Sequence, residues 1–189
     1  MPNNVRNILE IHCPDEGAMG KIKKVIFDHN EINEKVFTMK KLLPMPEGSS
    51  GQTGYTDYGY DWCCAIWGTK WDVYDYNIME SGDTILIYYS TAWSPNYRWG
   101  ESLCKFIQGI IRFDESEKIN SIYVKHRFHD YPMDFGGILE WKPKIAPEYK
   151  SFSFMEYAEL YDKKLFEIMT DLEKRMKENP DKIVVIKGY

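Results

Sequence analysis

The sequence has few cysteines, and their spacing gives no sign of a metal site or a disulfide framework. The four cysteines are Cys13, Cys63, Cys64 and Cys104, and no pair has the Cys-x-x-Cys spacing. A zinc ribbon or a thioredoxin-like redox motif is therefore not indicated. We expect reduced thiols that pack as small hydrophobic groups.

Long apolar runs and an excess of basic residues are also missing. No run approaches the roughly 20 apolar residues of a membrane-spanning helix. The opening MPNNVRNILEIHCP lacks the basic and apolar regions of a secretory signal. The formal net charge is −5, whereas proteins that bind duplex nucleic acid usually carry a basic surface. We expect a cytoplasmic protein with neither membrane nor duplex nucleic acid among its partners.

Recognisable catalytic motifs are absent as well. The sequence contains no Gly-x-Ser-x-Gly, no Walker loop and no His-Glu-x-x-His. Asp134-Phe135-Gly136 matches the kinase Asp-Phe-Gly triplet, but none of the other kinase motifs accompanies it. His126 and His129 would point to opposite faces of a strand, which disfavours a two-histidine metal site. We predict no catalytic residue, no bound metal and no cofactor.

Aromatic residues, in contrast, are abundant. They make up 15% of the 189 residues and include six Trp and fourteen Tyr. Tyr and Trp often supply core or interface area, since each combines a large apolar ring with one polar group. The length and a hydrophobic share of 43% predict one domain, 1–189, with its own core.

Hydrophobic periodicity and turn residues predict an α+β fold. The expected elements are a strand at 5–13, helices at about 14–30 and 60–67, a hairpin over 70–93 with its turn at 81–83, a helix at 100–113, strands at 118–130 and 136–144, a long helix at about 153–179 and a terminal strand at 183–189. This order matches the split β-α-β arrangement of ferredoxin-like folds, an antiparallel sheet with helices on one face. A loop insert at about 44–59 and the C-terminal helical extension at about 153–179 would be additions to it. Trp71 and Val73 are expected to share one face of the hairpin's first strand.

Five motifs carry a family resemblance: MPNNVRNILEI at 1–11, LLPMPEG at 42–48, YDWCCAIWGTKWDVYD at 60–75, TAWSP at 91–95 and DFGGILEW at 134–141. With these motifs in this order, the chain resembles the YubB-type ferredoxin-like proteins of plasmids and bacteriophages. The resemblance implies that fold and a phage or plasmid origin, and it implies no established catalytic activity. Phage proteins of this kind include candidates for countering host defence. Some phage proteins are sponges that hold nucleotide immune signals without cleaving them.

A ligand site is expected where aromatic and basic residues gather between positions 67 and 99. Trp67, Trp71 and Trp93 could line a cleft, with Lys70 and Arg98 supplying positive charge. Stacking of a base on an aromatic ring is worth ~1–3 kcal/mol, and a phosphate adds charge-assisted hydrogen bonds. Core packing is the alternative for Trp67 and Trp71, and it stays open here.

Two further segments complete the predicted site. In TAWSPNYRW, Ser94 would cap the following helix, whose free N–H groups favour anions, and Tyr97 and Arg98 would lie beside that helix start. In DFGGILEW, Asp134 could accept hydrogen bonds from a base or ribose. Gly136 and Gly137 would allow a close backbone approach or a bulge. Structural roles remain open for all of these residues.

The leading hypothesis is a non-enzymatic protein of phage or plasmid origin that sequesters a small nucleotide immune signal, such as a cyclic dinucleotide, in the host cytoplasm. The pocket would lie in one chain or at the interface of a homo-oligomer. One alternative is a phosphodiesterase acting on such a signal through His126, Asp130 or Asp134. Another is an interaction module that inhibits a host protein through its aromatic face.

Overall fold

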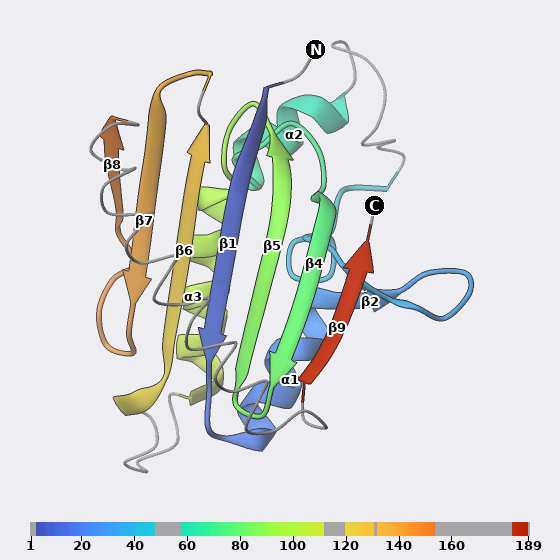
Figure 1. The fold of residues 1–189 in the computed structure, drawn as a ribbon, viewed down its shortest axis with the longest axis vertical. Coiled ribbons are helices and arrows are strands. Elements are labelled where there is room, and N and C mark those ends of the chain that lie inside the picture. The colour runs from blue at the N-terminus through green and yellow to red at the C-terminus, as the bar shows by residue number, and fades with distance from the viewer. Residues whose placement is uncertain (1–2, 48–57, 112–119, 131, 154–182, 189) are drawn as a thin grey trace.

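The computed structural model describes residues 3–47, 58–111, 120–130, 132–153 and 183–188. Its main element is a seven-stranded sheet with the order β8-β7-β6-β1-β5-β4-β9, in which all neighbours pair antiparallel (Figure 1). The strands are β1 (Asn4–His12), β4 (Tyr74–Ser81), β5 (Thr84–Ala92), β6 (Tyr123–Asp130), β7 (Phe135–Trp141), β8 (Tyr149–Ser153) and β9 (Ile183–Gly188). The predicted α+β class with a large antiparallel sheet is confirmed.

Helices α1 (Glu16–Ile26), α2 (Tyr58–Ile66) and α3 (Tyr97–Ile111) lie behind the sheet in the view of Figure 1. Alternate residues of β1, such as Leu9 and Ile11, are fully buried against this layer. They share one core with Ile22 of α1 and with Leu103 and Ile107 of α3. The apolar face that alternation gives to the strand therefore packs against the apolar faces that helical spacing gives to α1 and α3.

The opposite face of the central strands is also shielded from solvent. Ile8 of β1, Leu86 of β5 and Arg127 of β6 expose at most 3% of their surface. Strand β5 is accordingly buried at nearly every position. This burial on both faces fits its sequence TILIYYSTA, which is a nearly continuous run of β-branched, aromatic and apolar residues.

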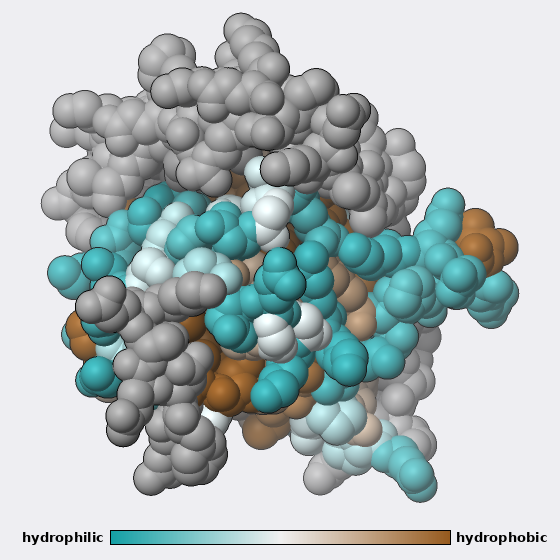
Figure 2. All heavy atoms as spheres, turned by 90° about the horizontal axis from the view of Figure 1, so that it is seen from below, coloured by the Kyte–Doolittle hydropathy of each residue, from teal (hydrophilic) through white to brown (hydrophobic). Residues whose placement is uncertain are grey.

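The first helix ends earlier than the sequence predicts. Asp15 caps α1 by accepting a hydrogen bond from the Ala18 amide at 2.6 Å, but the helix stops at Ile26 rather than near Asn30. The chain then forms a two-stranded ribbon, β2 (Phe27–His29) and β3 (Lys35–Phe37), which the periodicity did not predict. Its connection projects sideways from the body, as a largely hydrophilic arm with hydrophobic atoms near its end (Figures 1 and 2).

Several other predicted elements are confirmed, with shifted boundaries. Gly68 follows α2 with φ 89°, and Gly82 turns the β4–β5 hairpin with φ 56°, conformations that glycine adopts without strain. Strand β4 begins only at Tyr74, so Trp71 and Val73 precede it and do not share a strand face. Strand β8 was not predicted, whereas the terminal strand β9 was.

Two predicted features lie largely outside the described residues. The long helix at about 153–179 falls outside them except for Ser153, the last residue of β8. The loop insert at about 44–59 is described only up to 47 and from 58, where α2 begins. Among the residues that are described, no helix has the length and apolar character needed to cross a membrane.

Candidate functional site

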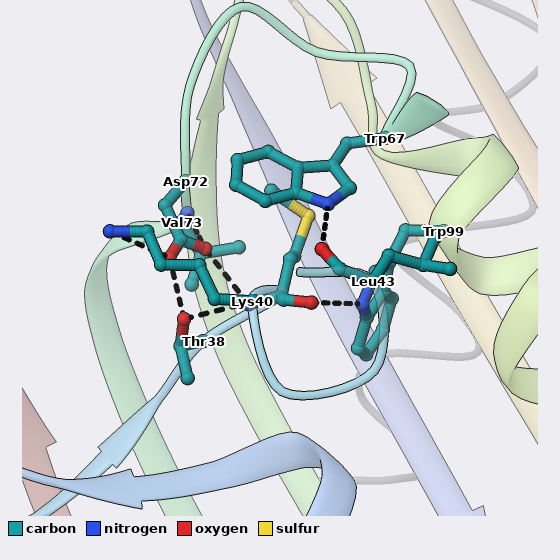
Figure 3. Close-up of polar contacts among 8 residues, drawn as sticks. Thr38, Lys40, Leu43, Trp67, Asp72, Val73 and Trp99 are labelled. Atoms are coloured by element: carbon teal, nitrogen blue, oxygen red, sulfur yellow. Dashed lines mark hydrogen bonds and ion pairs between the residues drawn. The ribbon is translucent and has the colours of Figure 1, made fainter. Parts of the chain in front are cut away.

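Two of the tryptophans near the predicted site are core residues. Trp67 and Trp99 are fully buried, and each indole N–H donates to a backbone carbonyl, that of Leu43 at 3.0 Å and that of Met39 at 3.2 Å (Figure 3). These bonds hold the segment after β3 against α2 and α3. Trp67 thus has the core-packing role left open by the sequence, and we do not include it in the candidate site.

Asp72 anchors the segment between α2 and β4 at the end opposite to Trp67. Its carboxylate accepts hydrogen bonds from the Thr38 hydroxyl at 2.6 Å and from the amides of Met39 and Val73, both at 2.9 Å (Figure 3). The role of Asp72 was not predicted from the sequence, because two of its partners, Thr38 and Met39, lie more than 30 positions away. With Trp67 and Asp72 anchored at its ends, the short segment 68–71 has little freedom.

Three other aromatic residues, Tyr60, Trp71 and Trp93, surround the side chain of Lys70. The Lys70 Nζ atom lies 4.2 Å from the ring centroid of Trp93, 4.6 Å from that of Trp71 and 5.8 Å from that of Tyr60. All three distances are within the range of cation–π attraction, about 6 Å. The rings of Tyr60 and Trp93 also meet edge to face at 6.2 Å. We call these four residues the lysine–aromatic cluster.

The cluster lies at the surface. Trp93 exposes 37% of its surface, and Tyr60, Lys70 and Trp71 are half-buried. Tyr60 belongs to α2, whereas the other three residues lie on the connections that lead into β4 and out of β5. The sequence predicted three members of this cluster and missed Tyr60, because only the fold brings α2 beside the end of β5.

The backbone around the cluster is tied down and locally strained. The Thr69 hydroxyl donates to the Ala92 carbonyl at 2.8 Å, and the Trp93 amide donates to the Asn3 carbonyl at 2.9 Å. Trp93 has φ 70°, and nearby Asp75, whose carboxylate pairs with Arg6 at 2.7 Å, has φ 50°. Such left-handed conformations cost about 1–3 kcal/mol each in non-glycine residues and concentrate at functional sites.

Ser94, Tyr97 and Arg98 hold the end of α2 against the start of α3. The predicted cap at Ser94 is wrong: its hydroxyl donates to the Gly68 carbonyl, and α3 begins only at Tyr97. Arg98 Nη1 donates to the Ala65 carbonyl near the end of α2, and its Nε donates to the Tyr97 hydroxyl at 3.2 Å. Arg98 remains exposed, so its charge is available next to the helix end.

The DFGGILEW residues do not join the cluster. Asp134 is exposed in the β6–β7 connection with φ 52°. Strands β6 and β1 separate β7 from β5, which puts three strand spacings, roughly 14 Å, between the two regions. Gly136 is buried and pairs with His129. At Gly137 a Cβ atom would overlap the Phe128 ring, so this glycine makes room for a core side chain.

His126 lies in the core and not at the surface. It exposes 1% of its surface, and its Nδ1 atom lies 2.7 Å from the Tyr149 hydroxyl. Its Nε2 atom lies 3.1 Å from both Asn7 Oδ1 and the Tyr89 hydroxyl. Because the Asn7 amide nitrogen donates to Thr91, its Oδ1 must accept, which assigns the proton to Nε2. Burial lowers the pKa of His126 to about 3, so the ring is neutral.

The burial of two thiols and of Asp130 disfavours catalytic roles for these three groups. Burial raises the pKa of Cys63 to about 11 and also raises the pKa of Cys104, so both stay protonated. Asp130 exposes 1% of its surface. In the described ranges of the chain, no group of three His, Cys, Asp or Glu side chains could hold a metal ion.

Comparisons of the chain with protein-family models, with curated proteins and with solved structures found no match. The resemblance to YubB-type proteins therefore rests on the sequence motifs alone and stays a prediction.

Proposed function

We propose that the protein binds a small nucleotide-type signal at the lysine–aromatic cluster and holds it without cleaving it. The observation that carries this proposal is the position of the Lys70 ammonium over two indoles, one of which, Trp93, is 37% exposed and held at φ 70°. Flat rings beside a positive charge favour a ligand that is both planar and anionic. The exposed Arg98 adds a second cation on the neighbouring helix.

The expected affinity is sufficient for sequestration. Stacking contributes ~1–3 kcal/mol per base, and a hydrogen bond to a charged group ~1.5–3 kcal/mol. Two stacked bases and two phosphates paired with cations thus approach the roughly −8 kcal/mol that corresponds to micromolar binding. The net charge of −5 does not oppose this, since a dinucleotide carries few charges compared with a duplex.

The broader setting is part of the same proposal. The order β6-β1-β5-β4, with α1 between β1 and β4 and α3 between β5 and β6, supports a ferredoxin-like fold with added edge strands. The sequence motifs support a phage or plasmid origin. We propose that the protein acts in the host cytoplasm, alone or as a homo-oligomer, and counters host defence by removing a cyclic dinucleotide or a related signal.

A thermal-shift screen with a panel of cyclic dinucleotides and mononucleotides tests the proposal. At least one ligand should raise the melting temperature of the wild type and be recovered intact after heat denaturation. Lys70→Gln should reduce the shift. Lys105→Gln, which removes an exposed lysine of α3 away from the cluster, should leave it unchanged. If no nucleotide shifts the wild type, the protein is not a nucleotide-binding protein.

The phosphodiesterase alternative has weaker support from the geometry. His126 and Asp130 are enclosed in the core, and only Asp134 of its three candidate residues is exposed. A hydrolase would yield a chromatographically distinct product at a rate proportional to enzyme concentration. Recovery of the intact ligand in the screen above would exclude that activity.

One observation favours an interaction module as a second candidate function. Ile32 exposes 74% of its surface at the turn between β2 and β3. The turn is rigid, because the Asn30 side chain accepts from the amides of Ile32 at 3.2 Å and Glu34 at 2.8 Å and donates to the Glu34 carboxylate at 3.1 Å. A preorganised turn loses little entropy when its apolar tip enters a pocket. The exposed Glu31 and Glu34 beside it favour a pocket with a basic rim.

Expression of the tagged protein in a bacterial host tests this second candidate. A single protein should co-purify in a stoichiometric amount with the wild type and be lost with Ile32→Glu. The matched control is Ile145→Glu, which changes a residue that is also exposed, at 62%, but lies outside the turn. The absence of a stoichiometric partner, or an equal loss in both variants, would argue against a docking role for the turn.

A further inference from the structure

Lys70 occupies the position that an external cation takes in an aromatic cage. Its Nζ atom is within 6 Å of the centroids of three rings, and the two nearest, Trp93 and Trp71, lie at 4.2 Å and 4.6 Å. Rings arranged in this way around an ammonium group attract it through their electron-rich faces. The side chain is therefore a tethered occupant of the lysine–aromatic cluster, and an incoming ligand competes with it for the indole faces.

The backbone holds the competing parts in place. Residues 69 and 70 are bonded to the Ala92 carbonyl, through the Thr69 hydroxyl at 2.8 Å and the Lys70 amide at 3.5 Å. Trp93 is fixed by the hydrogen bond that its backbone amide donates to the Asn3 carbonyl. A ligand can therefore displace the Lys70 side chain by rotating the bonds of that side chain, without moving the helix and the connections that carry the rings.

We propose that Lys70 selects ligands that combine a flat ring with an anionic group, which deepens the proposed function and rests on it. A neutral ring, such as a nucleoside, would displace the ammonium from the indoles without bringing an anionic group that pairs with it. Inorganic phosphate would pair with the ammonium but would not replace it on the rings. A nucleotide does both: its base covers the indole faces while its phosphate pairs with the released ammonium.

The substitution Lys70→Ala tests the proposal, since it should change the affinities for the two kinds of ligand in opposite directions. Binding of cyclic di-AMP and of adenosine is measured by calorimetry with the wild type, with Lys70→Ala and with the control Lys105→Ala. The variant should bind adenosine roughly tenfold more tightly than the wild type does, because the indoles are no longer occupied. It should bind cyclic di-AMP more weakly, by up to roughly tenfold, because the loss of the ammonium partner of the phosphate outweighs the gain from the vacated indoles.

Tetramethylammonium chloride serves as a probe that does not depend on nucleotide binding. The Lys70→Ala variant should bind this cation, with a change in tryptophan fluorescence that Trp93→Ala abolishes in the same background. The wild type should bind it at least several-fold more weakly, because its own ammonium fills the cluster. Equal binding to both proteins, or to neither, would overturn the assignment of Lys70 as a tethered occupant.

The two experiments separate failure of the inference from failure of the proposed function. If the wild type binds no nucleotide but the variant binds tetramethylammonium, the proposed function and the ligand class fail, whereas the tethered occupant stands. If the wild type binds cyclic di-AMP and the substitution weakens adenosine and cyclic di-AMP alike, nucleotide binding stands and the selection by Lys70 is refuted.

Discussion

The buried ring of His126 predicts a specific dependence of stability on pH. Its pKa is about 3 in the folded protein, because burial disfavours the charged form, against an ordinary value of 6.5. Protonation therefore favours the unfolded chain. The stability associated with the neutral ring is complete above pH 6.5, decreases as the pH falls below that value, and stops decreasing only near pH 3.

The size of the effect follows from the linkage between protonation and folding. Between pH 6.5 and 3 the unfolded state binds close to one more proton at this site, so the free energy of unfolding falls by up to about 1.4 kcal/mol per pH unit. From pH 8 to pH 5 the loss from His126 alone amounts to about 2 kcal/mol. Typical domains have only ~5–15 kcal/mol in total, so this loss is readily measured.

Urea unfolding at pH 8, 6.5 and 5 provides the assay, with the wild type compared with His126→Gln. Carboxylates contribute to both proteins, so the difference between their pH profiles isolates the ring. His29→Gln, at an exposed histidine of β2, is the matched control and should follow the wild type. We expect the wild type to lose about 2 kcal/mol more than His126→Gln does between pH 8 and 5.

Parallel profiles for the wild type and His126→Gln would refute this reasoning. If the variant does not fold, the wild type alone still decides the matter. The ring resonances of His126 should then show no protonation at pH 5 in the folded protein. Titration of this ring near pH 6.5 would mean that water reaches it and that the network with Tyr149 and Asn7 is not closed.

Three further predictions follow from the packing. Gly100→Ala should destabilise the protein by ~1–3 kcal/mol in urea unfolding, because the added Cβ would overlap a tyrosine hydroxyl of β8. Gly109→Ala in the same helix should stabilise the protein by ~0.5–1 kcal/mol, because its Cβ meets nothing within 4 Å. A loss of stability at both positions would contradict this prediction. Trp93→Gly should be about 1 kcal/mol more stable than Trp93→Ala, because glycine adopts φ 70° without strain; equal stabilities would show that no strain is present. In the native protein at pH 8, the half-buried Cys64 should be alkylated before Cys63, because burial raises the pKa of Cys63 to about 11. If mass spectrometry finds the reverse order, the burial of Cys63 is contradicted.

The parts of the fold with a strong local pattern could be predicted from the sequence. Glycines with positive φ, Gly68 and Gly82, end α2 and turn the β4–β5 hairpin at the predicted places. The β2–β3 ribbon could not be predicted, because each strand has only three residues and the apolar run Val25-Ile26-Phe27 gives no local signal that the helix ends. The tertiary pairing of Phe27 with Phe37 takes precedence over that local preference.

The candidate site was only partly predictable, since exposure is a property of the whole fold. Nothing in the spacing distinguishes Trp67, which is fully buried, from Trp93, which is 37% exposed. Tyr60 joins the cluster through the packing of α2, and Asp72 acquires its role from partners in the segment after β3. The sequence places aromatic and basic residues in one stretch of chain, but it does not determine which rings face outward.

Fluorine NMR of protein labelled with fluorotryptophan tests the central claim most directly. The six tryptophan resonances can be assigned by substitution. A titration with a cyclic dinucleotide should shift the resonances of Trp71 and Trp93 and leave those of Trp67 and Trp99 unchanged. If no nucleotide shifts the Trp71 and Trp93 resonances, or if the shifts occur only at the buried tryptophans, the lysine–aromatic cluster is not the binding site.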